Sequence, residues 1–187
     1  MRFQASIVCA AAAIGFSAPL TIHAGQATSS ASAANPISQA IRDTWEGAKR
    51  NMKESADQMP EADYAFRPTD QVRTFGQIIA HVAGANYVYC SAARKEKSLH
   101  EEDDFEKTAT TKAQIIKVFN DSLAYCDAAY TVLTDRTAAE VIPMPFGGKD
   151  AGRAAPLIRN VGHLNEHYGN LVTYFRIKGM VPPSSRR

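Results

Sequence analysis

The amino-acid sequence predicts an all-α protein built as one four-helix bundle. Four segments of about 20 residues each carry apolar residues at spacings of three and four, the pattern of a helix that buries one face. Helix start and stop signals bound these segments, and no segment between them predicts a strand. The chain has 187 residues, which is enough for one compact core. We therefore place a single helical domain over residues 36–181.

Residues 1–27 are typical of a secretory signal peptide and its cleavage region. An apolar run over 5–20 follows an arginine, and small residues lead to a cleavage site after Ala24 or Ala27. A retained membrane anchor is the alternative, but this alanine-rich run contains glycine and proline and barely reaches the roughly 20 apolar residues of a spanning helix. We expect an exported protein, periplasmic or extracellular, with no stable membrane insertion after cleavage.

The first helix follows a short leader. Residues 28–35 are small and polar and predict a flexible segment. Pro36 suits the first turn of a helix, and apolar residues recur at helical spacing up to Ala56. This helix ends near Met59, and the connection over 61–73 is expected to pack its aromatic side chains.

Capping signals begin the second and third helices. Thr74 and Gln77 form a capping box ahead of a helix over 75–96. Thr111 and Gln114 repeat the same box ahead of the third helix. The apolar row of that third helix comprises Ile115, Phe119, Ser122, Cys126, Tyr130 and Leu133.

The last helix runs from about Ala154 to Lys178, and Gly179 is its natural stop. The glycines at 147 and 148 and two nearby prolines show that the connection before it is not helical throughout. The connections between helices one and two and between helices three and four are long, so at least one is expected to cross the end of the bundle. Residues 182–187 predict a loose C-terminal tail.

The charge balance argues against one class of partner. The formal net charge is +2, and basic residues are scattered among acidic ones without forming a stripe. Nucleic acid is therefore not an expected partner.

Two cysteines, Cys90 and Cys126, lie in the part of the chain that follows the predicted cleavage site. An oxidising compartment permits a disulfide between them, although their pairing stays open at this point. Such a bridge would stabilise the fold by about 3 to 4 kcal/mol in the chain-entropy account.

Three histidines within the predicted helices are the candidate metal ligands. His163 and His167 are four residues apart on the last helix, which places both rings on one face. His81 lies in the apolar row of the second helix. Buried imidazoles without partners would each cost a few kcal/mol, so a shared divalent ion in the bundle interior explains the three together. Zinc or nickel suits nitrogen ligands, and three of them leave a position open, as in catalytic sites.

Other candidate ligands fit less well. Cys90 lies half a turn away from His81 on the same predicted helix. Cys126 lies in a core-facing row and could approach the ion, although a buried thiol or a disulfide is the more common state of such a residue. His100 lies in the charged segment 95–111 and is expected to be a solvated loop residue.

Residues 163–167 also match the inverted zinc-protease motif H-x-x-E-H, in which Glu166 would be the general base. Such proteases take a third ligand from well downstream, whereas only a short proline-containing segment follows His167. Glu166 is instead a candidate for polar support of the metal site, together with Asn170. The catalytic residues stay unassigned.

The segments around the histidines resemble DinB-like (YfiT-like) proteins. Residues 73–87, RTFGQIIAHVAGANY, are similar to the second helix of that family, and residues 162–171, GHLNEHYGNL, are similar to its last helix. The resemblance extends roughly over residues 37–185. It implies a bundle of the DinB/YfiT-like type with a metal site formed by one histidine on helix two and an H-x3-H pair on the last helix.

That family includes transferases and isomerases that act with low-molecular-weight thiols. Reduced thiols are scarce outside the cytoplasm, so an exported member departs from this chemistry. The resemblance also leaves open a homodimer.

The function expected from the sequence is a metal-dependent hydrolase or transferase with an unknown small-molecule substrate. The alternative is a non-enzymatic metal-binding or stress-related module, in which the ion stabilises the bundle or is itself the cargo. A plain helical interaction domain with incidental histidines is the third hypothesis.

Overall fold

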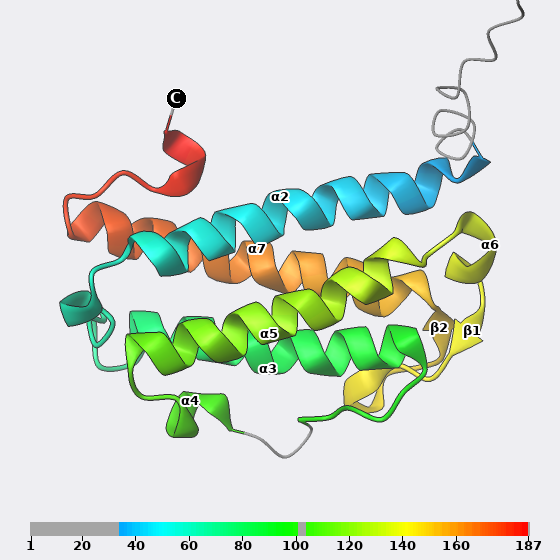
Figure 1. Cartoon of the computed structure of the whole chain (residues 1–187), viewed down its shortest axis with the longest axis horizontal. Coiled ribbons are helices and arrows are strands. Elements are labelled where there is room, and N and C mark those ends of the chain that lie inside the picture. Colours follow the sequence, from blue (N-terminus) through cyan, green and yellow to red (C-terminus); the bar gives the residue numbers. More distant parts are fainter. Residues whose placement is uncertain (1–33, 101–103, 187) are drawn as a thin grey trace, which may run out of the picture.

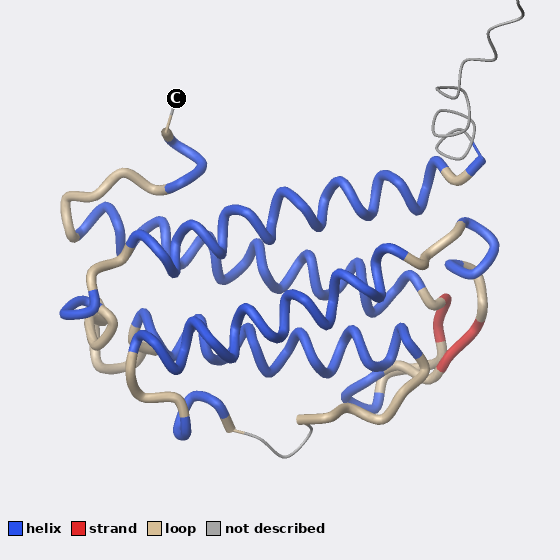
Figure 2. The backbone as a smooth tube through the Cα atoms, in the orientation of Figure 1, coloured by secondary structure: helices blue, strands red, loops and turns tan. Residues whose placement is uncertain are grey.

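Four long helices form the bundle, as the sequence predicts (Figures 1 and 2). The computed structural model describes residues 34–100 and 104–186. The predicted signal peptide and most of the predicted leader lie outside the described residues. The long helices are α2 (Pro36–Gln58), α3 (Phe75–Arg94), α5 (Lys112–Thr131) and α7 (Ala154–Ile177). Their bounds agree with the prediction to within about two residues, because local signals set their ends.

The two predicted capping boxes are present. Thr74 Oγ1 accepts a hydrogen bond from the Gln77 amide at 3.2 Å, and Gln77 Oε1 accepts one from the Thr74 amide at 2.9 Å. Thr111 and Gln114 make the same pair of bonds at the start of α5. Gly179, just beyond α7, has a φ of +71°, which is the left-handed conformation that ends a helix.

Short elements occupy the connections. They are η1 (Glu61–Asp63), α4 (Phe105–Thr108), α6 (Asp135–Ala138), β1 (Val141–Ile142), η2 (Pro145–Gly147), β2 (Ala151–Gly152) and η3 (Pro183–Ser185). Strands β1 and β2 pair antiparallel, with Val141 opposite Gly152. The expectation of no strand was wrong in this detail, because two residues are too few to show an alternating pattern.

The direction of the helices shows where the chain crosses over. Helices α2 and α7 run one way along the bundle, and α3 and α5 run the other way (Figure 1). Because α3 and α5 are parallel neighbours, the connection between them returns along the bundle, and its helix α4 packs against α3. The α2–α3 and α5–α7 connections each join helices that do not pack closely on one another, so they cross the ends of the bundle as expected. The return along the bundle between α3 and α5 was not predicted. The pairing of α3 with α5 decides it, and no local signal reports that pairing.

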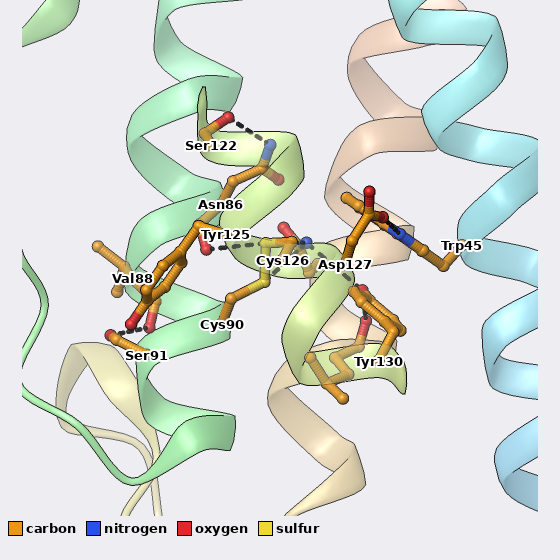
Figure 3. Close-up of a disulfide and its surroundings, with 12 residues drawn as sticks. Trp45, Asn86, Val88, Cys90, Ser91, Ser122, Tyr125, Cys126, Asp127 and Tyr130 are labelled. Carbon is orange, nitrogen blue, oxygen red and sulfur yellow. Dashed lines mark hydrogen bonds between the residues drawn. A yellow bond between two sulfur atoms is a disulfide. The ribbon is translucent and has the colours of Figure 1, made fainter. Parts of the chain in front are cut away.

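A disulfide joins α3 to α5 inside the bundle (Figure 3). Cys90 and Cys126 are bonded, and their Cα atoms are 5.3 Å apart. Nearby, the Trp45 ring of α2 stacks on the Tyr130 ring of α5 at 4.4 Å, and Trp45 Nε1 donates a hydrogen bond to Asp127. The centre of the bundle is therefore closed by packing and a covalent bond.

The C-terminal residues are ordered against the bundle rather than loose. Pro182 and Pro183 are buried, and η3 packs against α2. The Ser184 amide donates to the Tyr168 hydroxyl at 2.8 Å, and Arg186 pairs with Glu54 at 2.6 Å. The expectation of a loose tail was wrong because these partners are distant in sequence.

Across the described ranges, no helix is long and apolar enough to span a membrane.

Candidate metal centre

Helices α3 and α7 bring the three predicted histidines together. His163 Nε2 lies 3.1 Å from His81 Nε2 and 3.1 Å from His167 Nε2. One nitrogen from each ring lies within 4.8 Å of the others. Local helix geometry places the H-x3-H pair on one face, and the packing of α3 against α7 supplies His81. The residues are as predicted, and metal binding by them stays a prediction.

The spacing of the three nitrogens fits a single ion. Tetrahedral zinc with Zn–N bonds of about 2.0–2.1 Å separates its nitrogen ligands by roughly 3.3 Å. His163 Nδ1 is buried and has no hydrogen-bond partner among the described residues. The polar contacts of this ring are therefore made through Nε2, where three ring nitrogens converge. Facing lone pairs repel one another unless a proton or a cation lies between them, so the arrangement fits a divalent cation.

The site is open to solvent on one side. The His81 side chain is 29% exposed, His163 is half-buried and His167 is buried. The histidines lie along the α3–α7 seam, and the expected position of an ion in the bundle interior stays a prediction.

Glu106 of α4 is a site residue that the sequence did not reveal. Its Oε1 accepts a hydrogen bond from His81 Nδ1 at 2.9 Å, and its Oε2 accepts one from Arg73 Nε at 2.9 Å. A carboxylate behind a ligating imidazole fixes the tautomer, because the proton stays on Nδ1 and the Nε2 lone pair faces the metal. Glu106 lies in the acidic and basic segment 95–111, where nothing in the sequence distinguishes it from its neighbours.

The two predicted supporting residues are placed differently. Asn170 Nδ2 lies 3.4 Å from His167 Nδ1. Ligation through His167 Nε2 requires a proton on Nδ1, which would donate to the Asn170 amide oxygen after the amide rotates. Glu166 is exposed, and its carboxylate acts on His81 and His167 through space. Asn170 is thus the better placed of the two to orient a ligand.

Burial keeps the three imidazoles neutral. It lowers the pKa of His163 to about 3, with smaller contributions from His167, His81 and Arg73. Burial is also the largest cause that lowers the pKa of His81 and of His167. Neutral imidazoles have free lone pairs near pH 7, which is the form that binds a metal.

A cavity of about 730 Å³ opens beside the centre. His167 and Asn170 of α7 line it, together with Arg73, Gln77 and Glu106. This volume lies within the usual range for small-molecule sites, about 300–1,000 Å³. A ligand in the cavity would therefore lie next to His167 and Glu106.

The residues considered as alternative metal ligands lie outside the centre. Cys90 and Cys126 are joined to each other and do not ligate a metal. His100 is half-buried, and its ring lies 4.2 Å from that of Tyr87 and 5.3 Å from that of Phe105. The expectation of a solvated His100 was wrong, because its charged sequence neighbours do not report the aromatic residues that pack on it.

The fold and the site together define the class of protein, which is a four-helix bundle with three converging histidines. The sequence matches the profile of the DinB superfamily over residues 44–171. The chain belongs to the DinB superfamily. No curated protein matches it significantly.

Solved structures share the fold. A DinB-like protein from Bacillus subtilis aligns with a TM-score of 0.63 at 16% identity, over 79% of this chain and 99% of that one. A DinB-like protein from Bacillus cereus ATCC 10987 aligns with a TM-score of 0.61 at 15% identity, over 78% and 95%. A mycothiol-dependent maleylpyruvate isomerase aligns with a TM-score of 0.59 at 12% identity, over 72% of this chain and 60% of the isomerase. At these identities the likeness concerns the fold alone.

Proposed function

We propose that this protein binds one divalent metal ion, zinc or nickel, through His81, His163 and His167, and acts as a metal-dependent hydrolase or transferase on a small molecule. The observation that carries the proposal is the convergence of the three Nε2 atoms beside an open cavity. When bound, the ion would supply Lewis acidity to a ligand in the cavity. Three protein ligands leave room for that ligand.

The residues of the chain would prepare this centre. Glu106 holds the His81 proton on Nδ1, and this turns the Nε2 lone pair toward the ion. Asn170 stands in the corresponding position behind His167. Arg73 holds the second oxygen of Glu106 and so fixes the orientation of the carboxylate.

An enzyme is favoured over a module that uses the ion for stability. The buried core is continuous and a disulfide fastens it, so the fold has sources of stability apart from an ion. The ion would also lie at the edge of the cavity rather than between buried elements. The non-enzymatic metal-binding or stress-related module is the second candidate, and the experiment below separates the two.

Export to the periplasm or the cell exterior is part of the proposal. The bond between Cys90 and Cys126 supports it, because disulfides persist in oxidising compartments. A structural neighbour is described as mycothiol-dependent, which supports a transferase or isomerase on this fold. Because such thiols are scarce outside the cytoplasm, we do not propose a thiol cofactor for this protein.

The test is elemental analysis and thermal melting of the purified wild type and of His163→Ala. Asn165→Ala, an exposed position on the same helix, is the matched control. We expect about one metal ion per wild-type and control chain, and none in His163→Ala.

The two candidates predict different melting behaviour. A functional site predicts that His163→Ala loses its metal and keeps its fold, with a cooperative transition. A structural ion predicts that the variant unfolds when the metal is lost. Wild-type protein that takes up no stoichiometric zinc or nickel would refute both.

A further inference from the structure

We propose that the cavity beside the metal centre binds a small carboxylic acid, and that Arg73 is the residue that recognises its carboxylate. This inference rests on the proposed metal site and names the chemical class of its substrate.

The guanidinium of Arg73 is held at one side and free at the other. Its Nε donates to Glu106 Oε2 at 2.9 Å, and the backbone carbonyl of Arg73 accepts a hydrogen bond from the Tyr174 hydroxyl. The two terminal nitrogens have no partner within residues 34–100 and 104–186, and the side chain is 44% exposed. A planar fork with free N–H groups, held at its base, is suited to a bidentate bond with a carboxylate.

Among the described residues, one cationic side chain lines the cavity. Arg73 and Glu106 are the only Asp, Glu, Lys or Arg side chains among the described residues that line it. Both oxygens of Glu106 already accept hydrogen bonds, from His81 and from Arg73. An incoming anion would therefore meet the free face of Arg73, and Glu106 would stay committed to its two partners.

The charges nearest the loaded site favour one further negative charge. A divalent ion and Arg73 contribute three positive charges, whereas Glu106 and the nearby Glu166 contribute two negative ones. An imidazole that ligates a metal through one nitrogen and keeps a proton on the other carries no charge. The remaining single positive charge matches a monoanion such as a carboxylate better than a phosphate dianion.

Backbone groups do not supply an alternative anion site here. Helix α3 begins next to Arg73, but its first amides are already used. Phe75 and Gly76 donate to the carbonyls of Phe66 and Tyr64, each at 2.9 Å, and Gln77 donates to Thr74. Recognition of the anion thus depends on the Arg73 side chain.

The rest of the wall suits the uncharged part of such a molecule. Thr69, Gln77, Asn170 and Thr173 offer hydroxyl and amide groups, and Ile78 is apolar. A ligand with its carboxylate on Arg73 and a hydroxyl or carbonyl oxygen toward the histidines would use both ends of the site. Polar groups that fix orientation in a partly apolar pocket are typical of small-molecule sites.

The experiment is calorimetric titration of the zinc-loaded protein with ω-hydroxycarboxylates of two to six carbons. The corresponding primary amides are the uncharged isosteres, and inorganic phosphate is the competing anion. The proteins are wild type, Arg73→Gln and Arg73→Lys. Arg67→Gln is the matched control, because Arg67 lies in the same connection, pairs with Asp70 and does not line the cavity. Zinc content is measured in every sample.

We expect at least one acid to bind wild type and the Arg67→Gln control alike. Arg73→Gln should bind it about 10- to 100-fold more weakly, as for the loss of a charge-assisted hydrogen bond, and Arg73→Lys should fall between. Amides and phosphate should bind more weakly than the acid.

Three results would overturn the inference: no acid binds the zinc-loaded protein, the amide binds as well as the acid, or Arg73→Gln binds like wild type. Failure of the metal site is detected separately, because the wild-type protein would then contain no zinc. In that case the same titrations are carried out on the zinc-free proteins. Binding of an acid that depends on Arg73 would support the anion site, and no such binding would overturn it.

Discussion

Glu106 shows how one side chain can set the chemistry of a site formed by others. It touches His81 and Arg73, and through them it joins the candidate metal centre to the cavity. Its position on the short helix α4 depends on Phe105, which is buried against the bundle. A carboxylate in this position orients its imidazole and strengthens it as a ligand.

We predict that Glu106→Gln lowers zinc affinity by about 10- to 100-fold, since a neutral amide holds the His81 proton less firmly. The fold should be unchanged. Competition with a chelator measures the affinity, and circular dichroism checks the helix content.

Asp104→Asn is the control for this change. Asp104 precedes the same helix and pairs with Lys107, and no contact joins it to the described histidines of the site. Equal zinc affinities for Glu106→Gln and wild type would show that Glu106 does not position His81.

At the scale of the elements, one helix is capped by another. The N-cap residue of α2, Asn35, makes no side-chain capping bond within its own helix. Asp135 of α6 supplies the acceptor, since its Oδ1 receives bonds from the Ser38 amide at 2.8 Å and the Ser38 hydroxyl at 2.7 Å. Carboxylates favour the positive end of a helix dipole, so α6 holds the start of α2.

These hydrogen bonds from Ser38 are the main cause that lowers the pKa of Asp135. A group with a lowered folded-state pKa stabilises the fold above its unfolded pKa of about 3.9, and this stabilisation is lost as the pH falls through the folded value. We predict that Asp135→Asn melts at a lower temperature than wild type at pH 7. The difference should shrink as the pH falls below 4.

Thermal melts between pH 7 and pH 2.5 measure this effect. Asp121→Asn is the control, because Asp121 is an exposed residue that pairs with Lys117 within α5. A melting difference for Asp135→Asn that stays constant down to pH 2.5 would rule out the carboxylate as its source.

At the scale of the whole molecule, the disulfide ties together two parallel helices that a crossover connection separates in sequence. Cys90 and Cys126 are 36 residues apart. Cross-linking a loop of that length restricts the unfolded chain and stabilises the fold by about 3 to 4 kcal/mol in the chain-entropy account.

We therefore predict that a reductant lowers the free energy of unfolding of wild type by about 3 to 4 kcal/mol. The double variant Cys90→Ala/Cys126→Ala should be destabilised at least as much, because it also loses buried side-chain atoms. Urea unfolding with and without dithiothreitol measures both effects.

The double variant is its own control for the reductant, since its urea midpoint should not respond to dithiothreitol. A wild-type midpoint that is equally insensitive, with the bond shown by mass spectrometry to be reduced, would contradict the predicted stabilisation.

The sequence by itself determined the helices and the three histidines. Capping boxes at Thr74 and Thr111, the proline at 36 and the stop at Gly179 act over a few residues, so their effects can be predicted without the fold. The His163–His167 spacing is likewise a property of a single helix. The cysteine pairing, in contrast, stayed open until the structure placed Cys90 beside Cys126.

Only the tertiary structure decided what surrounds the histidines. Glu106, Arg73 and the cavity they line come from segments that meet because α4 and α7 pack on α3, and Asp135 reaches Ser38 across 97 positions of sequence. The ordered C-terminus and the packed His100 have the same origin. Local signals report the backbone conformation within a few residues, whereas a site depends on which distant side chains the packing of the helices brings together.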